Sequence, residues 1–406
     1  MDMTKNEFLV YSLSTTYAES SKFNNQFVHI LNKELVKLGI KIKTITPHAK
    51  NLLTEEEIDG VHVKRFRYLP EKYEINSAIS DEVSKTRIGF FKIFIMSVNF
   101  FVFTFFECLK EKPDILHGHW AFPGGYIGYL MSKIFGKRFI VTVHGGEIAL
   151  LKKFKFLRKI VVNSLNQSYL VIANSSFTKN EMMKLGVYNE KITIIKIPPN
   201  FVERETNIEN LKTFRKKFTD LSSKIILFVG RLVELKGVEY LIRSLIEIKK
   251  TEVHLIIVGN GPLKNNLHKL TSSLGLENKV SFFGRANKKE LGVLHGISDV
   301  LVCPSIIDSQ GATEGLGLVI PEAMNSGLPV IASSVGGIVD TIKNEENGLL
   351  VEQKNPKSLA LAIERLCSDD ELRKKIIENS KETVKEFSSS LIAKKHYKIF
   401  KKIIEN

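Results

Sequence analysis

Residues 314–330 read EGLGLVIPEAMNSGLPV and decide the fold of the chain. Two glutamates, Glu314 and Glu322, stand eight positions apart in this window, with two glycines between them. Pro321 fits the first turn of a short helix, where its missing N–H would have no partner in any case. Gly327 marks the end of that helix, and a new apolar strand follows. The window therefore predicts a glycine-containing loop that runs directly into a helix N-terminus.

Such a helix end is suited to anions. Its backbone N–H groups lack partners within the helix and carry a partial positive charge, so they can hold a phosphate. A glycine lets the ligand approach the backbone closely, and a glutamate at the helix start can accept hydrogen bonds from a sugar diol. A plain loop with a glutamate cap would explain the loop and helix alone. The coincidence of both glutamates, both glycines and the proline favours a ligand site.

The composition is that of an ordinary globular protein. The chain has 406 residues, enough for two or three domains, and 43% of them are hydrophobic. Three widely spaced cysteines exclude a disulfide framework and a cysteine-rich zinc site, which fits a reducing cytoplasm. The formal net charge is +15, which suits an anionic partner, but no nucleic-acid-binding module is present. We therefore expect a cytoplasmic protein that does not bind nucleic acid.

The first half of the chain begins with a strand–helix–strand unit. Residues 7–12 form a short apolar run, residues 26–38 have a helical period of apolar positions, and residues 40–47 alternate and end in proline. This order is typical of a parallel sheet with helices on its faces. Residues 88–108 are nearly long enough and apolar enough to span a bilayer. Polar residues interrupt them, which favours a buried or membrane-skimming helix.

Two histidine-containing segments follow strands of this half. Residues 117–125, HGHWAFPGG, read as a loop that lines a cleft, with His119 and Trp120 as candidate contacts. A metal site is the alternative there, but no third ligand lies near in the sequence. The strand at residues 138–143 ends in His144, which two glycines follow. Open α/β sheets form their sites at this strand end, so a site role and a structural role both remain open for His144.

Residues 150–159, LLKKFKFLRK, carry five positive charges and no negative one. The apolar residues alternate with the basic ones, as in a helix that lies on anionic lipid. A solvated helix with its leucines packed inward explains the pattern equally well, and both readings stay open.

The second half starts again with a strand, at residues 224–229, and then places Arg231 and Lys236 in the loop after it. Two cations at a sheet's carboxyl edge suit a diphosphate. The segment at residues 201–223 is charged and polar, and the domain boundary is expected there. The expected domains are residues 1–200 and 201–387, and a last helix at about residues 388–406 could pack back on the first domain.

Several of these groups together resemble one family, the retaining glycosyltransferases of family 4. The matching pieces are the two glutamates with GLGLVIPEA, SGLPVIASSVGG, Gly230-Arg231 with Lys236-Gly237, Val258-Gly259-x-Gly261-Pro262, Phe283-Gly284, Ser298-Asp299, His144-Gly145 and HGHWAFPGG. The resemblance implies an α/β chain of GT-B architecture, with two facing Rossmann-like domains that have parallel sheets and a cleft between them. It also implies a nucleotide-sugar donor in the second domain and an acceptor against the first.

The resemblance also implies roles for individual residues. Arg231 and Lys236 would bind the donor diphosphate, together with the backbone of Gly317, Leu318 and Val319. Glu322 would bind the ribose, and Arg285 would lie near the base. His144 and Glu314 would be the catalytic candidates at the donor sugar, and His119 and Trp120 would lie on the acceptor side. The family's glycine pair in the first loop is replaced here by Ser-Lys-Phe-Asn-Asn at residues 21–25, which puts phosphate contact by that loop in doubt.

The expected reaction is retaining transfer of a hexosyl group from a UDP- or GDP-sugar to a glycan or lipid-linked acceptor. No Asp-x-Asp occurs in the chain, so we expect no metal and no cofactor, with the cations stabilising the leaving diphosphate. A nucleotide-sugar epimerase or hydrolase on the same fold is the alternative. The basic segment and residues 88–108 predict peripheral association with an anionic membrane surface at the inner face of the cell membrane.

Overall fold

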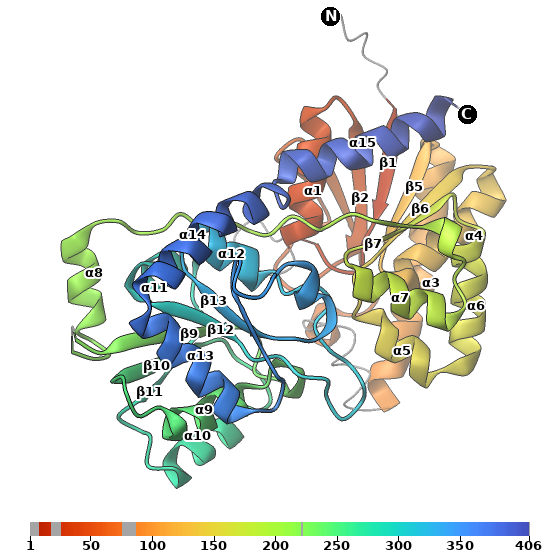
Figure 1. Ribbon diagram of the computed structural model, residues 1–406. Helices are drawn as coiled ribbons and strands as arrows, with labels where there is room; N and C mark the ends of the chain where they lie inside the picture. Colours follow the sequence, from red (N-terminus) through yellow and green to blue (C-terminus); the bar gives the residue numbers. More distant parts are fainter. Residues whose placement is uncertain (1–7, 18–25, 75–86, 221, 406) are drawn as a thin grey trace, which may run out of the picture. The chain divides into compact units, whose positions relative to one another are not determined.

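The computed structural model describes residues 8–17, 26–74, 87–220 and 222–405 (Figure 1). The chain divides into two compact units, each built around its own sheet. Unit 1 comprises Met1–Pro198 together with Ser388–Asn406, and unit 2 comprises Pro199–Phe387. Both units have parallel strands with helices on both faces, which confirms the α/β fold predicted from the sequence.

The sheet of unit 1 has eight strands in the order β3-β4-β2-β1-β5-β6-β7-β8. All neighbours are parallel except β3, which pairs antiparallel with β4 at the edge. The strands are β1 (Leu9–Leu13), β2 (Lys41–Pro47), β3 (Glu55–Ile58), β4 (Val61–Phe66), β5 (Ile115–His119), β6 (Arg138–Val143), β7 (Leu170–Ala173) and β8 (Ile192–Ile194). Alternate residues of β1 enter different cores, since Tyr11 and Leu13 face one cluster and Val10 faces the other. The sheet is therefore buried on both sides, as parallel sheets are.

Two sets of helices cover the two faces of this sheet. Helices α1 (Gln26–Lys37) and α15 (Ser389–Glu405) pack together and share one core with the sheet. The other face carries α3 (Arg87–Lys110), α4 (Tyr126–Phe135), α5 (Glu147–Lys153), α6 (Lys155–Asn166) and α7 (Ser176–Leu185). Helix α15, the blue helix beside α1 in Figure 1, is the end of the chain and belongs to unit 1.

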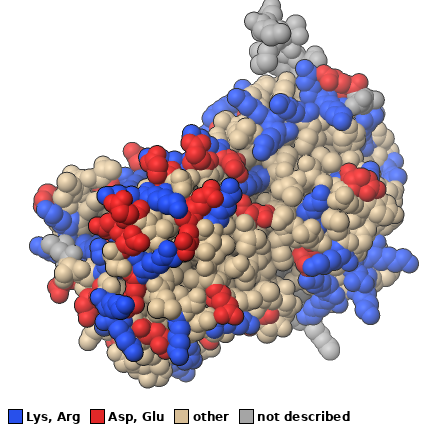
Figure 2. Space-filling view, viewed as in Figure 1, with Lys and Arg blue, Asp and Glu red and all other residues tan. Residues whose placement is uncertain are grey.

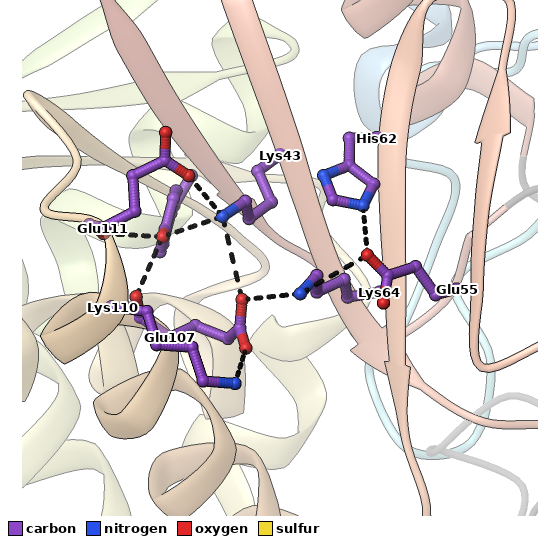
Figure 3. Close-up of polar contacts among 8 residues, drawn as sticks. Lys43, Glu55, His62, Lys64, Glu107, Lys110 and Glu111 are labelled. Atoms are coloured by element: carbon purple, nitrogen blue, oxygen red, sulfur yellow. Dashed lines mark hydrogen bonds and ion pairs between the residues drawn. The ribbon is translucent and has the colours of Figure 1, made fainter.

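A group of ion pairs fixes the C-terminal end of α3 to the sheet (Figure 3). The Glu107 carboxylate is buried and lies 3.1 Å from the Lys64 amine of β4 and 3.7 Å from the Lys43 amine of β2. The hydroxyl of Tyr11 donates to the backbone carbonyl of Glu111 at 2.6 Å. Because an unpaired buried charge is costly, these contacts hold α3 in one position on the sheet.

The sheet of unit 2 has six strands in the order β11-β10-β9-β12-β13-β14, and all neighbours are parallel. They are β9 (Lys224–Val229), β10 (Val253–Val258), β11 (Val280–Gly284), β12 (Val300–Cys303), β13 (Val330–Ser333) and β14 (Leu349–Val351). The helices are α8 (Ile208–Arg215), α9 (Val238–Glu247), α10 (Lys264–Ser273), α11 (Lys288–Ile297), α12 (Val319–Asn325), α13 (Pro356–Ser368) and α14 (Asp370–Lys385). Along β9, Ile226 and Phe228 enter one core and Ile225 and Leu227 enter the other.

Two local predictions are wrong. The basic stretch at residues 150–159 is two helices, because Phe154 has an extended backbone, φ −110° and ψ 92°, between α5 and α6. The segment at residues 117–125 is not a loop throughout, since β5 continues to His119 and pairs with Thr142 of β6. The charged segment at residues 201–223 contains α8, which packs on α11 within unit 2.

Candidate active site

The predicted donor residues of unit 2 gather at the carboxyl edge of its sheet. The strand order reverses between β9 and β12, since the chain builds outward from β9 on one side and from β12 on the other. Open α/β sheets bind ligands in the crevice at this point. The loop after β9 supplies Arg231 and Lys236, and the segment after β12 supplies Glu314.

Lys236 and Glu314 form an ion pair across this point of the sheet. Both side chains are largely withdrawn from solvent, and the Ser305 hydroxyl donates to the Glu314 carboxylate at 3.5 Å. Burial lowers the pKa of Lys236, but the Glu314 carboxylate outweighs burial and holds that pKa above its usual value. The lysine is therefore a fixed cation at neutral pH. In this structure its charge is directed to Glu314.

Glycines allow the loops around this pair to approach one another. A Cβ on Gly237, which has φ +62°, would lie 2.0 Å from the carbonyl oxygen of Pro304 after β12. A Cβ on Gly336, with φ +56°, would lie 2.1 Å from the carbonyl oxygen of Glu314. No side chain fits at either position. The Glu314 backbone is also fixed by the N–H of Gly337, which donates to its carbonyl oxygen at 2.9 Å.

Glu322 lies in α12, as the sequence predicts, and its carboxylate accepts a hydrogen bond from the backbone N–H of Asn200 at 3.2 Å. Burial raises the pKa of Glu322 to about 7, although this hydrogen bond and Lys236 act in the opposite direction. A carboxylate with such a pKa has spare acceptor capacity when it is ionised. It is suited to receive hydroxyl donors from a ligand.

The remaining donor candidates surround the same edge. Gly317, with φ +74°, makes the turn before α12, and the N–H of Ile320 donates to its carbonyl oxygen. Leu318 and Val319 open the helix, where the first N–H groups have no partner within the helix. Arg231 is exposed immediately after β9, and Arg285 is exposed immediately after β11.

In unit 1, His144 follows β6 and lies among aromatic rings. Its ring centroid is 4.7 Å from that of Trp120 and 4.9 Å from that of Phe27, at the start of α1. Among the described residues, neither ring nitrogen of His144 has a hydrogen-bond partner. Burial lowers the pKa of His144 to about 3, so the ring is neutral at physiological pH. Both ring nitrogens are buried, so the neutral imidazole has unused hydrogen-bonding capacity beside Trp120.

His119 differs from the expectation of a cleft-lining loop residue. It lies in β5, is 1% exposed, and stacks between His117 and His144 at centroid distances of 4.2 and 5.7 Å. Burial holds the pKa values of His117 and His119 well below the usual range. The structure therefore places His119 behind His144, and Trp120, with φ +62°, at the turn that leaves the strand.

Glu147 is a site residue that the sequence analysis did not single out. Its buried carboxylate accepts hydrogen bonds from the backbone N–H of His144 at 3.2 Å and of Ala121 at 3.1 Å. It thereby joins the turn after β5 to the turn after β6. The clue in the sequence is an acid three positions after His144, at the start of α5, where a carboxylate is favoured by the helix dipole.

Other calls on the site concern metals and the first loop. No group of three or more potential ligating side chains that could hold a metal ion occurs within the described ranges. Residues 21–25, on which the contact of the first loop with phosphate depends, lie outside the described residues.

Comparison with known proteins assigns the family and the fold of the chain. The model of the family "Glycosyltransferase Family 4" matches residues 25–203, and that of "Glycosyl transferases group 1" matches residues 210–383. An uncharacterized glycosyltransferase of Methanocaldococcus jannaschii is 31% identical over 389 residues, which are 92% of this chain and 93% of the relative. The fold is thus that of a GT-B glycosyltransferase. The chain belongs to glycosyltransferase family 4.

Solved structures share this fold over the whole chain. A sucrose-phosphate synthase from Thermosynechococcus elongatus has a TM-score of 0.79 at 21% identity, and covers 98% of this chain and 100% of its own. The Anabaena protein HepE, solved in complex with UDP, has a TM-score of 0.76 at 20% identity, and covers 97% and 99%. At these identities the likeness shows the fold alone.

Proposed function

We propose that the protein transfers a hexosyl group from a UDP- or GDP-sugar to a glycan or lipid-linked acceptor, with retention of configuration. The observation that carries the proposal is the arrangement at the switch point of unit 2. There the largely enclosed Lys236, which is paired with Glu314, lies at one sheet edge with Glu322, whose pKa is near neutrality, and with a helix N-terminus. These are the groups that a nucleotide diphosphate linked to a sugar needs.

In this proposal each group of unit 2 has one task. Lys236 and Arg231 stabilise the charge that develops on the leaving diphosphate, and the N–H groups at the start of α12 assist. Glu322 accepts hydrogen bonds from the ribose hydroxyls. Glu314 orients the donor sugar. When the diphosphate binds, it competes with Glu314 for Lys236, which frees a carboxylate oxygen for a sugar hydroxyl.

Unit 1 provides the acceptor side in this proposal. His144 contacts the donor sugar near the reacting carbon through a neutral ring nitrogen, and Trp120 offers an aromatic surface to the acceptor. Same-face attack assisted by the departing phosphate accounts for retention without a protein nucleophile. We propose a metal-independent reaction in the cytoplasm at the inner face of the membrane, where a lipid-linked acceptor would be held.

The test is a donor panel without metal. The purified chain is incubated with UDP- and GDP-linked sugars, and nucleotide diphosphate release and thermal stabilisation are followed with and without a lipid extract. UDP-glucose is a natural first member, because the fold is shared with HepE, which was solved with UDP-glucose. Release from one donor that increases with the extract would support the proposal.

Two results would contradict it. Nucleotide diphosphate release at the same rate with and without every acceptor would indicate an epimerase or a hydrolase. The absence of stabilisation by any nucleotide sugar would remove the donor site from unit 2.

A further inference from the structure

The outer face of α3 is a continuous apolar surface without a partner in the described part of the chain. Its exposed large apolar residues recur every three or four positions and are Phe91, Phe94, Val98, Val102, Phe106 and Leu109. This spacing places all six on one side of the helix. Phe91 and Phe94 are 64% and 65% exposed. A contiguous exposed stripe of this kind marks an interaction surface.

The opposite face of α3 belongs to the core of unit 1. Met96 and Phe100 are buried against the sheet, and the ion pairs of Glu107 fix the end of the helix to β2 and β4 (Figure 3). Phe91–Lys110 is the one described helix segment that is long and apolar enough to cross a membrane. If α3 crossed a membrane, these contacts with the sheet would break. A binding partner must therefore contact the exposed stripe while α3 stays packed on the sheet.

Helix α6, on the same face of the sheet as α3, also exposes an apolar side chain, and cations flank it. Phe156 of α6 is 79% exposed, between the exposed Lys155 and Lys159 on the outer side of that helix. Helix α4 packs against both α3 and α6, so the three helices form one layer over the sheet. The outer surface of this layer combines apolar side chains with positive charge.

The segment from the start of α4 to the end of α6 carries charge of almost one sign. Residues 126–166 contain eight cations, Lys133, Lys137, Arg138, Lys152, Lys153, Lys155, Arg158 and Lys159, and one acid, Glu147, which is buried. The space-filling view shows blue side chains gathered over the α5–α7 end of unit 1 (Figure 2). Such a combination attracts an anionic surface, and it disfavours a second copy of the same face, because like charges would meet.

We propose that the layer formed by α3, α4 and α6 docks unit 1 on an anionic lipid bilayer. The α3 stripe and Phe156 enter the headgroup region, and the lysines of α5 and α6 contact the lipid phosphates, as in helices that lie in the membrane interface. This proposal rests on the proposed function in one respect, which is that a lipid-linked acceptor would be held in the membrane. Its physical basis is the exposed apolar stripe and the adjoining cations.

The experiment is flotation of the full chain with vesicles, without any donor. One set of vesicles contains equal parts phosphatidylcholine and phosphatidylglycerol, and the other contains phosphatidylcholine alone. We expect binding to the anionic set, with binding weakened by salt because exposed charges are screened. The variant Lys153→Gln/Lys155→Gln/Lys159→Gln should partition on the order of a hundredfold less, at about fivefold per lysine near the surface. The variant Phe94→Gln/Val98→Gln should lose on the order of a hundredfold, because it removes two apolar side chains from the bilayer contact.

The matched control is Lys394→Gln/Lys395→Gln/Lys398→Gln. It removes the same charge from exposed positions of α15, on the opposite face of the same sheet. It should float like the unaltered chain. If both lysine variants lost vesicle binding equally, the attraction would be non-specific and the proposal would be overturned. The absence of binding to anionic vesicles would also overturn it. A dimer that Phe94→Gln/Val98→Gln abolishes, without vesicle binding, would assign the face to self-association. Donor stabilisation is measured separately, so failure here leaves the donor site standing.

Discussion

The cations of the switch point differ in their surroundings. Lys236 is enclosed and paired with Glu314, whereas Arg231 is exposed beside the strand end. A side chain held by an internal partner needs little rearrangement to serve a ligand, and preorganised charge is the main source of electrostatic stabilisation. Both residues were predicted from the sequence, because cations in the loop after an apolar strand can be recognised from the sequence alone. The ion pair of Lys236 with Glu314, 78 positions away in the chain, was not predicted.

The first prediction concerns Arg231. Because it stabilises charge on the leaving diphosphate in the proposed reaction, Arg231→Ala should lower kcat by about 10²–10³-fold, as removal of one oxyanion donor does. The melting temperature should change little, since the side chain is exposed. Initial rates on the donor found in the panel measure the effect. The control is Lys279→Ala, a lysine just before β11 that forms a surface ion pair with Glu252. Turnover close to normal would remove Arg231 from the mechanism.

The second prediction concerns the ionisation of Glu322. Burial raises its pKa to about 7, and only the carboxylate form accepts two hydroxyl donors. Nucleotide affinity should therefore rise with pH across that value, and Glu322→Gln should abolish this rise. Calorimetric titration with UDP and GDP at several pH values measures it. An equally steep rise in the variant would mean that another group titrates.

The same raised pKa fixes the sign of a stability effect. The folded chain keeps a proton on Glu322 that the unfolded chain releases near pH 4.5. This contribution to the free energy of unfolding is therefore present at low pH and is lost as pH rises toward about 7. Glu322→Gln should be more stable than the unaltered chain above that pH.

At the scale of elements, the parallel strands could be predicted and the antiparallel edge strand β3 could not. Alternating or continuous apolar runs such as residues 224–229 identify buried strands, because both faces of the sheet are covered. β3, with the sequence EEEI, carries no such signal, since it is an exposed edge strand defined by pairing with β4. The extension of β5 to His119 depends on Gly118. A Cβ there would lie 2.6 Å from the Cα of Gly125, and this contact is invisible in the sequence.

The third prediction concerns a group of four buried histidines contributed by β5, the end of β6 and α15. They are His117, His119, His144 and His396, and burial lowers the pKa of each. Below about pH 6.5 these histidines become protonated in the unfolded chain, whereas in the folded chain they stay neutral. The free energy of unfolding should therefore fall as pH decreases from about 6.5 toward the lowered values, by up to about 1.4 kcal/mol per pH unit for each histidine.

Urea unfolding at a series of pH values measures this slope. His396→Gln should reduce the slope by the share of one histidine. A slope that does not respond to His396→Gln would mean that acid acts elsewhere. An increase in stability on acidification would contradict the direction of the lowered pKa values.

At the scale of the whole molecule, the fourth prediction concerns the assignment of α15. Phe400 is fully buried in unit 1, with its ring centroid 6.4 Å from that of Phe8 and 5.7 Å from that of His117. Phe400→Ala should cost about 3–5 kcal/mol of stability, as large-to-small changes in a core do. Hydrogen exchange should increase in the strands of unit 1 and stay unchanged in β9–β13. The control is Leu391→Ala, at a more exposed position of the same helix. Loss of protection in unit 2 instead would contradict the division into units.

The division of the chain has a consequence for biosynthesis. Unit 2 is one continuous segment, whereas unit 1 needs Ser388–Asn406 to complete its core. A ribosome delivers every residue of unit 2 before α15 emerges, so the second unit in the sequence can finish folding first. Until α15 emerges, the nascent unit 1 leaves uncovered the apolar surface on which Phe400 and Ile403 later pack. A stop codon just before the last helix would therefore yield a chain with an intact unit 2 and a unit 1 recognised by chaperones and proteases.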